Sequence, residues 1–228
     1  MSTRNLLAIT LLFLGLAVRF VNLDYPRQVV FDEVHFGKFI NSYCCTRENF
    51  FDIHPPHGKL LIAAAARLGG YLGEAEFTHI GEQYPSQTAV SALRALPALA
   101  GGILPLVIFM LLLHAGVRIE FAFLGGLAVA LDNALVLGSR VIALDSILLL
   151  AGFGSLLAFL KAEKAGGQRQ ILLLVTAGCL AGLSAGVKFT GLSALALLGV
   201  LTLWRLARSK TSAHALSWIK RGLTVLAA

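Results

Sequence analysis

Two short segments of this sequence gather the side chains that proteins use to move protons and bind anions. They are FDEVHFGKF at 31–39 and FFDIHPPHGK at 50–59. Carboxylates and imidazoles act as general bases, and cationic groups stabilise negative charge. An explanation without catalysis is that both are polar loop segments that start helices, with Asp32 as a helix N-cap. The titratable residues of the two segments are Asp32, Glu33, His35, Lys38, Asp52, His54, His57 and Lys59.

A second group of charged residues interrupts long apolar runs. An ionisable group within a membrane is costly, so it usually faces an internal cavity and marks a functional site. The structural alternative is a set of buried ion pairs, for instance one between Arg140 and Asp145. The members of this group are Arg94, Asp132 (next to Asn133), Arg140, Asp145 and Lys188.

The elements that carry these residues are predicted to be membrane-spanning helices. Of the 228 residues, 57% are hydrophobic and 14% are charged, whereas soluble domains are roughly 25% charged. A chain this apolar requires lipid as its solvent, which predicts an all-α integral membrane protein. Six or seven spans are predicted, at 5–21, 88–114, 120–138, 141–160, 170–187 and 189–204, with a basic link at 205–221 and the start of another span at 222.

The two ends of the sequence carry further expectations. No small-residue cleavage site follows the first span, so this span is predicted to be retained. The last apolar stretch begins at Gly222 and stops at Ala228, short of the ~20 residues that a span needs. We therefore expect 1–228 to be the N-terminal part of a longer transmembrane domain whose C-terminal part is missing.

Basic residues predict the orientation of the spans, because cytoplasmic links are rich in Lys and Arg. With the N-terminus in the cytoplasm, the only acidic residues on that side are Glu120 and Glu163, and the loop at 22–87 is extracytoplasmic. Membrane orientation thereby accounts for the net charge of +7, and nucleic acid is not predicted as a partner. The basic residues on the cytoplasmic side are Arg4, Arg118, Lys161, Lys164, Arg169, Arg205, Arg208, Lys210, Lys220 and Arg221.

The loop at 22–87 is long enough to carry structure of its own. Within 33–43, bulky apolar residues recur at three- and four-residue spacing, as in an amphipathic helix. Pro55 and Pro56 suit the first turn of a second helix, which continues through GKLLIAAAARLGGYLG. Both helices are predicted to lie along the membrane surface.

These placements predict one cavity at the extracytoplasmic interface, acidic at its loop edge and basic underneath. A lipid-linked phosphate would place its anionic head at this depth. Basic groups would hold the phosphate, and a carboxylate would be left to accept a proton.

Four segments together resemble the protein O-mannosyltransferase family: FDEVHFGKF, FFDIHPPHGKLL, LDNALVLGSRVIALDSILL at 131–149 and GVKFTGL at 186–192. They follow one another in the order found in the family and span most of the chain. The resemblance implies a GT-C-type bundle that transfers mannose, with inversion, from polyprenyl (dolichyl) phosphate mannose to serine or threonine hydroxyls of proteins. It also implies a multi-pass protein of the bacterial plasma membrane or the endoplasmic reticulum membrane, with an extracytoplasmic active site, and it is compatible with a homodimer or a heterodimer.

Carried over by position, the resemblance makes Asp32 the catalytic aspartate and Glu33 a residue that supports or orients the site. One carboxylate suffices for a single inverting displacement, because a phosphate leaves without a strong acid once its charge is stabilised. The residues expected on the phosphate side are His54, Lys59, Arg94 and Arg140, with Asp145 orienting Arg140.

Three alternatives stay open. A related GT-C transferase would move a different sugar or use a different acceptor. A transporter would use Asp32, Glu33 and the intramembrane charges as an ion path, but transporters tend to have repeated halves and no repeat is evident. A divalent metal could be bound by the carboxylates and imidazoles of the loop, but no spacing fixes its geometry, so no cofactor is predicted. A disulfide between Cys44 and another segment of the chain is likewise left open.

Overall fold

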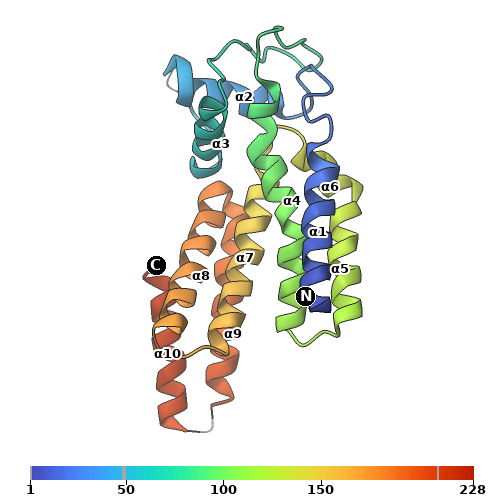
Figure 1. The fold of residues 1–228 in the computed structure, drawn as a ribbon. Coiled ribbons are helices and arrows are strands. Elements are labelled where there is room, and N and C mark those ends of the chain that lie inside the picture. Colours follow the sequence, from blue (N-terminus) through green and yellow to red (C-terminus); the bar gives the residue numbers. More distant parts are fainter. Residues whose placement is uncertain (1, 48–49, 210) are drawn as a thin grey trace.

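The structure, a computed structural model, describes residues 2–47, 50–209 and 211–228. Its long helices run side by side as a bundle (Figure 1). Lys210, counted above among the cytoplasmic basic residues, lies outside the described residues. The elements are α1 (Thr3–Phe20), α2 (Glu33–Asn41), the π-helical turn η1 (Ser42–Thr46), α3 (His57–Leu68), α4 (Val90–His114), α5 (Ile119–Leu131), α6 (Asn133–Ser139), α7 (Asp145–Glu163), α8 (Gly167–Val187), the short 3-10 helix η2 (Phe189–Gly191), α9 (Leu192–Ala207) and α10 (Ser212–Leu226).

The predicted spans are confirmed as helices. Within the described ranges, five are long and apolar enough to cross a membrane: Thr3–Phe20, Val90–His114, Asp145–Glu163, Gly167–Val187 and Phe189–Ala207. The remaining predicted span, at 120–138, is broken into α5 and α6, which meet at 53°. The break occurs because the Asp132 carboxylate accepts a hydrogen bond from the Leu135 backbone N–H at 2.8 Å and so caps a new helix.

The region after α9 differs from the expectation. The stretch at 205–221 is predicted as a basic link, but the structure has a helix from Ser212 to Leu226. Trp218 and Val225, seven residues apart, are buried in a cluster formed with α7, α8 and α9. An apolar stripe two turns long therefore makes this segment a packed helix in spite of its charges.

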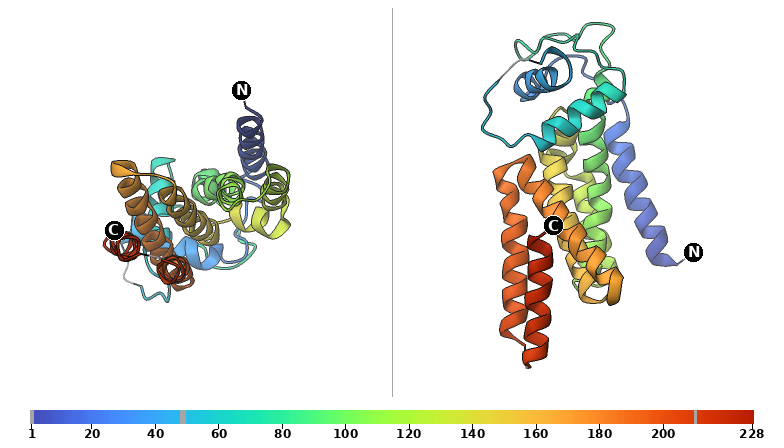
Figure 2. Two further views of the ribbon diagram at one scale, coloured as in Figure 1. Left: turned by 90° about the horizontal axis from the view of Figure 1, so that it is seen from below. Right: turned by 90° about the vertical axis from the view of Figure 1, so that its left-hand side faces the viewer.

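Two groups of helices meet where α4 packs against α7. One group contains α1, α4, α5 and α6, and the other contains α7 to α10 (Figures 1 and 2). Within the first group, α1 and α4 approach closely at Gly15 and Gly102, where a Cβ added to Gly15 would collide with the Gly102 carbonyl. Small residues allow such close backbone approach between membrane helices.

The loop at 22–87 forms a cap over one end of the bundle (Figure 2). Its two ends are joined by a short antiparallel pairing of Gln28 with Gln83, in which the Val29 N–H donates to the Glu82 carbonyl at 2.8 Å. Both predicted loop helices are present, as α2 and α3. They share one apolar core with α4, α7 and α8, which fixes the loop against the bundle.

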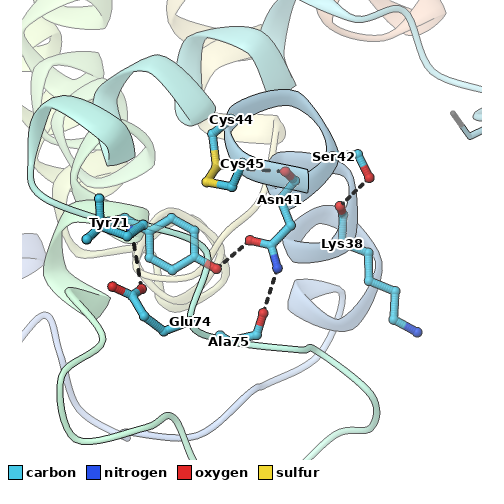
Figure 3. Close-up of a disulfide and its surroundings, with 9 residues drawn as sticks. Lys38, Asn41, Ser42, Cys44, Cys45, Tyr71, Glu74 and Ala75 are labelled. Atoms are coloured by element: carbon cyan, nitrogen blue, oxygen red, sulfur yellow. Dashed lines mark hydrogen bonds between the residues drawn. A yellow bond between two sulfur atoms is a disulfide. The ribbon is translucent and has the colours of Figure 1, made fainter. Parts of the chain in front are cut away.

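A buried polar cluster links the end of α2 to the segment that follows α3 (Figure 3). The side-chain amide of Asn41 donates to the Ala75 carbonyl at 2.6 Å, and the Tyr71 hydroxyl donates to the Asn41 side-chain oxygen. Burial raises the pKa of the Tyr71 phenol, so it stays protonated as a donor. Cys44 and Cys45 are bonded to each other in η1, which replaces the pairing with a distant segment considered from the sequence.

Candidate active site

Glu33 is the centre of a buried hydrogen-bond network beneath the cap. Its side chain has no exposed surface. It accepts hydrogen bonds from Arg94 Nε at 2.8 Å and Arg94 Nη2 at 3.0 Å, and from the Tyr84 hydroxyl at 3.0 Å. The backbone N–H groups of Val30 and Ile142 also donate to it, each at 3.0 Å. One carboxylate thus joins both ends of the loop to α4 and to the connection between α6 and α7.

Arg94 is fully engaged within the protein. Besides its two bonds to Glu33, it donates to the carbonyls of Leu23 at 3.3 Å, Pro26 at 3.0 Å and Gln28 at 3.2 Å. These bonds use all five N–H groups of a guanidinium, and the side chain has no exposed surface. The structure therefore differs from the expectation that Arg94 holds a phosphate: here it holds the start of the loop and neutralises Glu33.

Tyr84 is a hydrogen-bond donor to Glu33, and its surroundings keep its hydroxyl protonated. Burial raises the pKa of its phenol, and the adjacent Glu33 carboxylate raises that pKa further, although the Arg94 charge acts in the opposite direction. The Tyr84 hydroxyl therefore stays protonated and can only donate to Glu33. Its ring also lies under the Arg94 guanidinium, 5.7 Å from the ring centroid.

Asp32, the residue just before Glu33, has the opposite environment. It is partly exposed, and its carboxylate has no hydrogen bond or ion pair among the described residues. It occupies the N-cap position of α2, and its backbone carbonyl accepts the Phe36 N–H at 3.0 Å, but its side chain makes no capping hydrogen bond. Helix capping therefore does not engage the Asp32 carboxylate. Phe31, just before it, has a φ of 49°, a left-handed conformation that non-glycine residues adopt at a cost.

The second sequence cluster is partly closed on itself. The Lys59 ammonium is buried, bonds to the Asp52 carboxylate and donates to the His54 carbonyl at 2.9 Å. Burial lowers the pKa of Lys59. This ammonium therefore serves to fold the segment before α3, whereas the expectation placed it against a phosphate. The His54 ring differs, because it is partly exposed and stacks on Phe36 with 6.3 Å between the ring centroids.

Arg140 and Asp145, considered above as an ion pair, each bond to other partners. Asp145 accepts a hydrogen bond from Lys188 Nζ at 2.8 Å, and not from Arg140. Arg140 instead donates to four backbone carbonyls at the end of α1, at 2.8 to 3.0 Å. The last carbonyls of a helix have no partner within it, and this guanidinium supplies one. The prediction that Asp145 orients Arg140 is therefore wrong. The four carbonyls belong to Val18, Arg19, Val21 and Asn22.

Lys188 connects this ion pair to α2. Its ammonium lies 6.0 Å from the centroid of the Phe36 ring, the ring on which His54 stacks. Phe36 stands one helical turn after Asp32. The part of the cap near Asp32 therefore carries an imidazole and an ammonium, both partly exposed. The sequence marks Lys188 as an intramembrane charge, but only the structure brings it to α2.

The structure also reveals a residue that the sequence analysis did not single out. Arg19 lies near the end of α1, has no exposed surface and donates to the Ser139 hydroxyl at 3.0 Å. It also donates to the carbonyls of Gly15, Ala130 and Val129 at 3.2 to 3.3 Å. It thus satisfies the carbonyls freed where α5 ends. An arginine inside a predicted span is the signal that could have identified it.

Two further features bear on what the site can bind. Among the described residues, no three His, Cys, Asp or Glu side chains are grouped so that they could hold a metal ion. A pocket of about 240 Å³ between α7 and α9 is lined mainly by apolar residues, with Ser193 and with Ser184, which precedes Lys188 by one helical turn. A mainly apolar pocket thus lies about one helical turn from Lys188.

The fold and the site together define a multi-pass helical membrane protein with a free carboxylate on a rigid loop, next to cationic side chains and an apolar pocket. The family model described as dolichyl-phosphate-mannose-protein mannosyltransferase matches residues 9–225. The chain therefore belongs to the dolichyl-phosphate-mannose-protein mannosyltransferase family.

This chain is similar to proteins named as mannosyltransferases, both in sequence and in structure. Protein O-mannosyltransferase 1 of Drosophila melanogaster is 39% identical over 208 residues, covering 89% of this chain and 23% of that protein. Dolichyl-phosphate-mannose–protein mannosyltransferase 1 of Saccharomyces cerevisiae is 35% identical, covering 83% of this chain and 23% of that protein. The solved S. cerevisiae protein O-mannosyltransferase Pmt1–Pmt2 complex bound to the sugar donor has a chain that matches with a TM-score of 0.92 and 31% identity, over 100% of this chain and 32% of that one. This chain spans about a quarter of the length of the curated relatives it matches.

Proposed function

We propose that the full-length protein transfers mannose from a polyprenyl (dolichyl) phosphate mannose to serine or threonine hydroxyls of proteins, with Asp32 as the general base. The observation that carries the proposal is the free, partly exposed carboxylate of Asp32 beside the fully engaged Glu33. Membership of the family supports the reaction class. The similar yeast complex is bound to the sugar donor, which supports a site for such a donor in this protein.

In the proposed reaction, the acceptor oxygen attacks the anomeric carbon of mannose as the bond from that carbon to the phosphate oxygen breaks. The configuration inverts, the hydroxyl proton passes to Asp32, and the electron pair of the broken bond leaves with the lipid phosphate. Because a phosphate is a good leaving group, the main demand on the protein is to stabilise its developing charge. No metal or second acid is required for this balance.

The phosphate is assigned to the cationic groups that are partly exposed. His54 keeps this predicted role because its ring is partly exposed. Lys188 is added, because its ammonium is partly exposed, lies by Phe36 and pairs with Asp145, whose side chain is itself 57% exposed. Arg94, Lys59 and Arg140 donate to internal groups and act by holding the loop and α1 in place. The polyprenyl chain is assigned to the apolar pocket between α7 and α9.

The setting of the reaction follows from the orientation of the helices. The cap, with most of the acidic residues, is placed on the extracytoplasmic face, and the basic ends of the helices in the cytoplasm. The membrane is that of the endoplasmic reticulum, in line with the eukaryotic relatives, or the bacterial plasma membrane. The similar yeast structure contains two different subunits, which supports assembly of this protein as a dimer, with itself or with a related chain.

The test uses the full-length protein in lipid nanodiscs, a radiolabelled polyprenyl phosphate mannose and a peptide rich in serine and threonine. Asp32→Asn keeps the shape of the side chain but removes its basicity, so kcat should fall by about 10²–10⁴-fold while protein abundance stays unchanged. Asp132→Asn is the matched control, because Asp132 is an exposed aspartate whose carboxylate already accepts a hydrogen bond from the Leu135 N–H as the cap of α6. Near-normal transfer by the Asp32 variant would refute the assignment of the base.

A further inference from the structure

A second pocket lies at the opposite end of the bundle from the cap, between α8 and α10. Its volume is about 460 Å³. The residues from α8 belong to its first two turns, about 20 Å from the end of α8 under the cap at 1.5 Å per residue. The pocket is therefore separate from the candidate active site. Its lining consists of Gln170, Ile171, Leu174, Leu216, Ser217, Lys220, Arg221 and Thr224.

The cations of this pocket lack acidic partners among the described residues. Glu120 and Glu163 are the acidic residues at this end of the bundle. Glu120 pairs with Arg118 at 3.3 Å and Glu163 pairs with Arg205 at 3.0 Å. Lys220 and Arg221 are therefore left without a countercharge in the part of the chain that the structure describes.

The guanidinium of Arg221 is fixed in place but incompletely bonded. It lies over the Trp218 ring, 4.4 Å from the centroid, and Trp218 itself is buried against Phe159. Its Nε is buried and has no hydrogen-bond acceptor among the described residues. A guanidinium that stacks on an aromatic ring still presents its edge to a phosphate. The stacking thus orients a donor for an anionic group.

Three of the other lining residues, Ile171, Leu174 and Leu216, are apolar and give the pocket a hydrocarbon surface beside its polar groups. Ile171 is 57% exposed and Leu216 is 52% exposed, and both border the pocket. A small soluble anion would bind the two cations but would leave the apolar surface uncovered. A hydrocarbon chain would cover the apolar surface but would leave the two cations without a countercharge. A ligand with a phosphate and an adjoining acyl chain satisfies both halves.

We infer that the pocket between α8 and α10 binds an anionic glycerophospholipid, with its phosphate at Lys220 and Arg221 and its acyl chain along Ile171 and Leu216. Ser217 supplies a hydroxyl at the same level of α10. The surrounding excess of basic residues at this end of the bundle adds attraction for anionic lipids.

The experiment measures lipid binding to the full-length protein in detergent by native mass spectrometry, with short-chain phosphatidylserine, short-chain phosphatidylcholine and inorganic phosphate as separate probes. The parent should prefer phosphatidylserine. Removing both charges, in Lys220→Gln with Arg221→Gln, should weaken that binding about thirtyfold, because each basic residue near a membrane surface contributes about a fivefold factor. The control removes two charges from the same end, in Arg4→Gln with Arg118→Gln, outside the pocket, and should change binding less than twofold.

Lys220→Gln alone serves if the Arg221 change impairs folding, since Lys220 is exposed; it should weaken phosphatidylserine binding about fivefold. Equal losses in the pocket and control pairs would overturn the inference, because general surface charge would then explain the binding. Equal binding of the two lipids would also overturn it. Full saturation of the site by inorganic phosphate, with no gain from an acyl chain, would show a free-anion site in place of a lipid site.

Discussion

Breaking the buried pair of Glu33 and Arg94 distinguishes an internal role for Arg94 from a direct contact with the donor phosphate. Both side chains have no exposed surface, and two of the five hydrogen bonds to Glu33 come from Arg94. Replacing either residue alone, as Arg94→Met or Glu33→Met, leaves the other charge buried without a partner. Such a change costs about 3–5 kcal/mol.

The double variant measures the coupling free energy between Glu33 and Arg94. Each single change includes the cost of one stranded charge, whereas the double change strands none. The cost of the double variant should therefore fall short of the sum of the single costs by about 3 kcal/mol. Arg118→Met is the control: Arg118 pairs with Glu120 at the surface, where both side chains are more than half exposed, so its loss should cost at most about 1 kcal/mol.

The assay is a denaturant titration of the full-length protein in detergent, combined with the donor KM of each variant that folds. Tyr84→Phe is a milder probe, because it removes one neutral donor to Glu33, at 3.0 Å, and should cost about 0.5–1.5 kcal/mol. Additive costs of the two single changes would refute the coupling. Parental stability of Arg94→Met with a raised donor KM would restore Arg94 as a phosphate ligand.

Two further predictions follow from the site and from the bundle. Lys188→Gln removes a partly exposed cation, so kcat/KM for the donor should fall about 10²-fold with little change in the peptide KM, whereas Lys161→Gln at the other end of the bundle should be neutral. Steady-state kinetics with both substrates checks this, and unchanged donor kinetics would contradict the role of Lys188. Gly15→Ala forces a Cβ against the Gly102 carbonyl and should destabilise the protein by about 1–3 kcal/mol. Gly182→Ala, where an added Cβ meets nothing within 4 Å, is its control in the same denaturant titration, and equal effects of the two changes would contradict tight packing at Gly15.

Much of the fold could be predicted because the lipid environment makes long apolar runs diagnostic. Backbone groups in lipid must be satisfied within the chain, so a run of the right length becomes a helix. The bend at Asp132 was harder to predict: the sequence shows a polar residue inside a span, but only the local geometry shows that its carboxylate bonds to the Leu135 N–H. For α10, the many basic residues favoured a link over a helix. The spacing of Trp218 and Val225, two turns apart on its buried face, does predict a packed helix.

The positions of the charged residues could be predicted better than their partners. The sequence placed Arg94 and Arg140 correctly near the loop side, but it suggested charged or phosphate partners for them. Both guanidiniums bond largely to backbone carbonyls, as Arg19 does. Carbonyls are present at every residue, so no sequence pattern marks the few that are left unpaired where a helix ends or breaks. Asp145 illustrates the same point, because it bonds to Lys188, 43 positions away, and not to Arg140, five positions away.

The two neighbouring carboxylates are assigned different duties on physical grounds. Asp32 and Glu33 have almost the same chemistry, so their surroundings must decide which one reacts. A base has to approach the serine or threonine hydroxyl of the substrate to about 2.6–3.2 Å. Glu33 has no exposed surface and accepts five hydrogen bonds within the protein, so it is held away from any such hydroxyl. Its fixed position serves Asp32 instead, because Asp32 lies in a turn closed by two hydrogen bonds: the Glu33 N–H donates to the Val30 carbonyl and the Val30 N–H donates to the Glu33 carboxylate, each at 3.0 Å. A misplacement of about 1 Å can cost 10²-fold in rate, so a free carboxylate on a tightly held backbone combines the reactivity and the positioning that the proposed transfer requires.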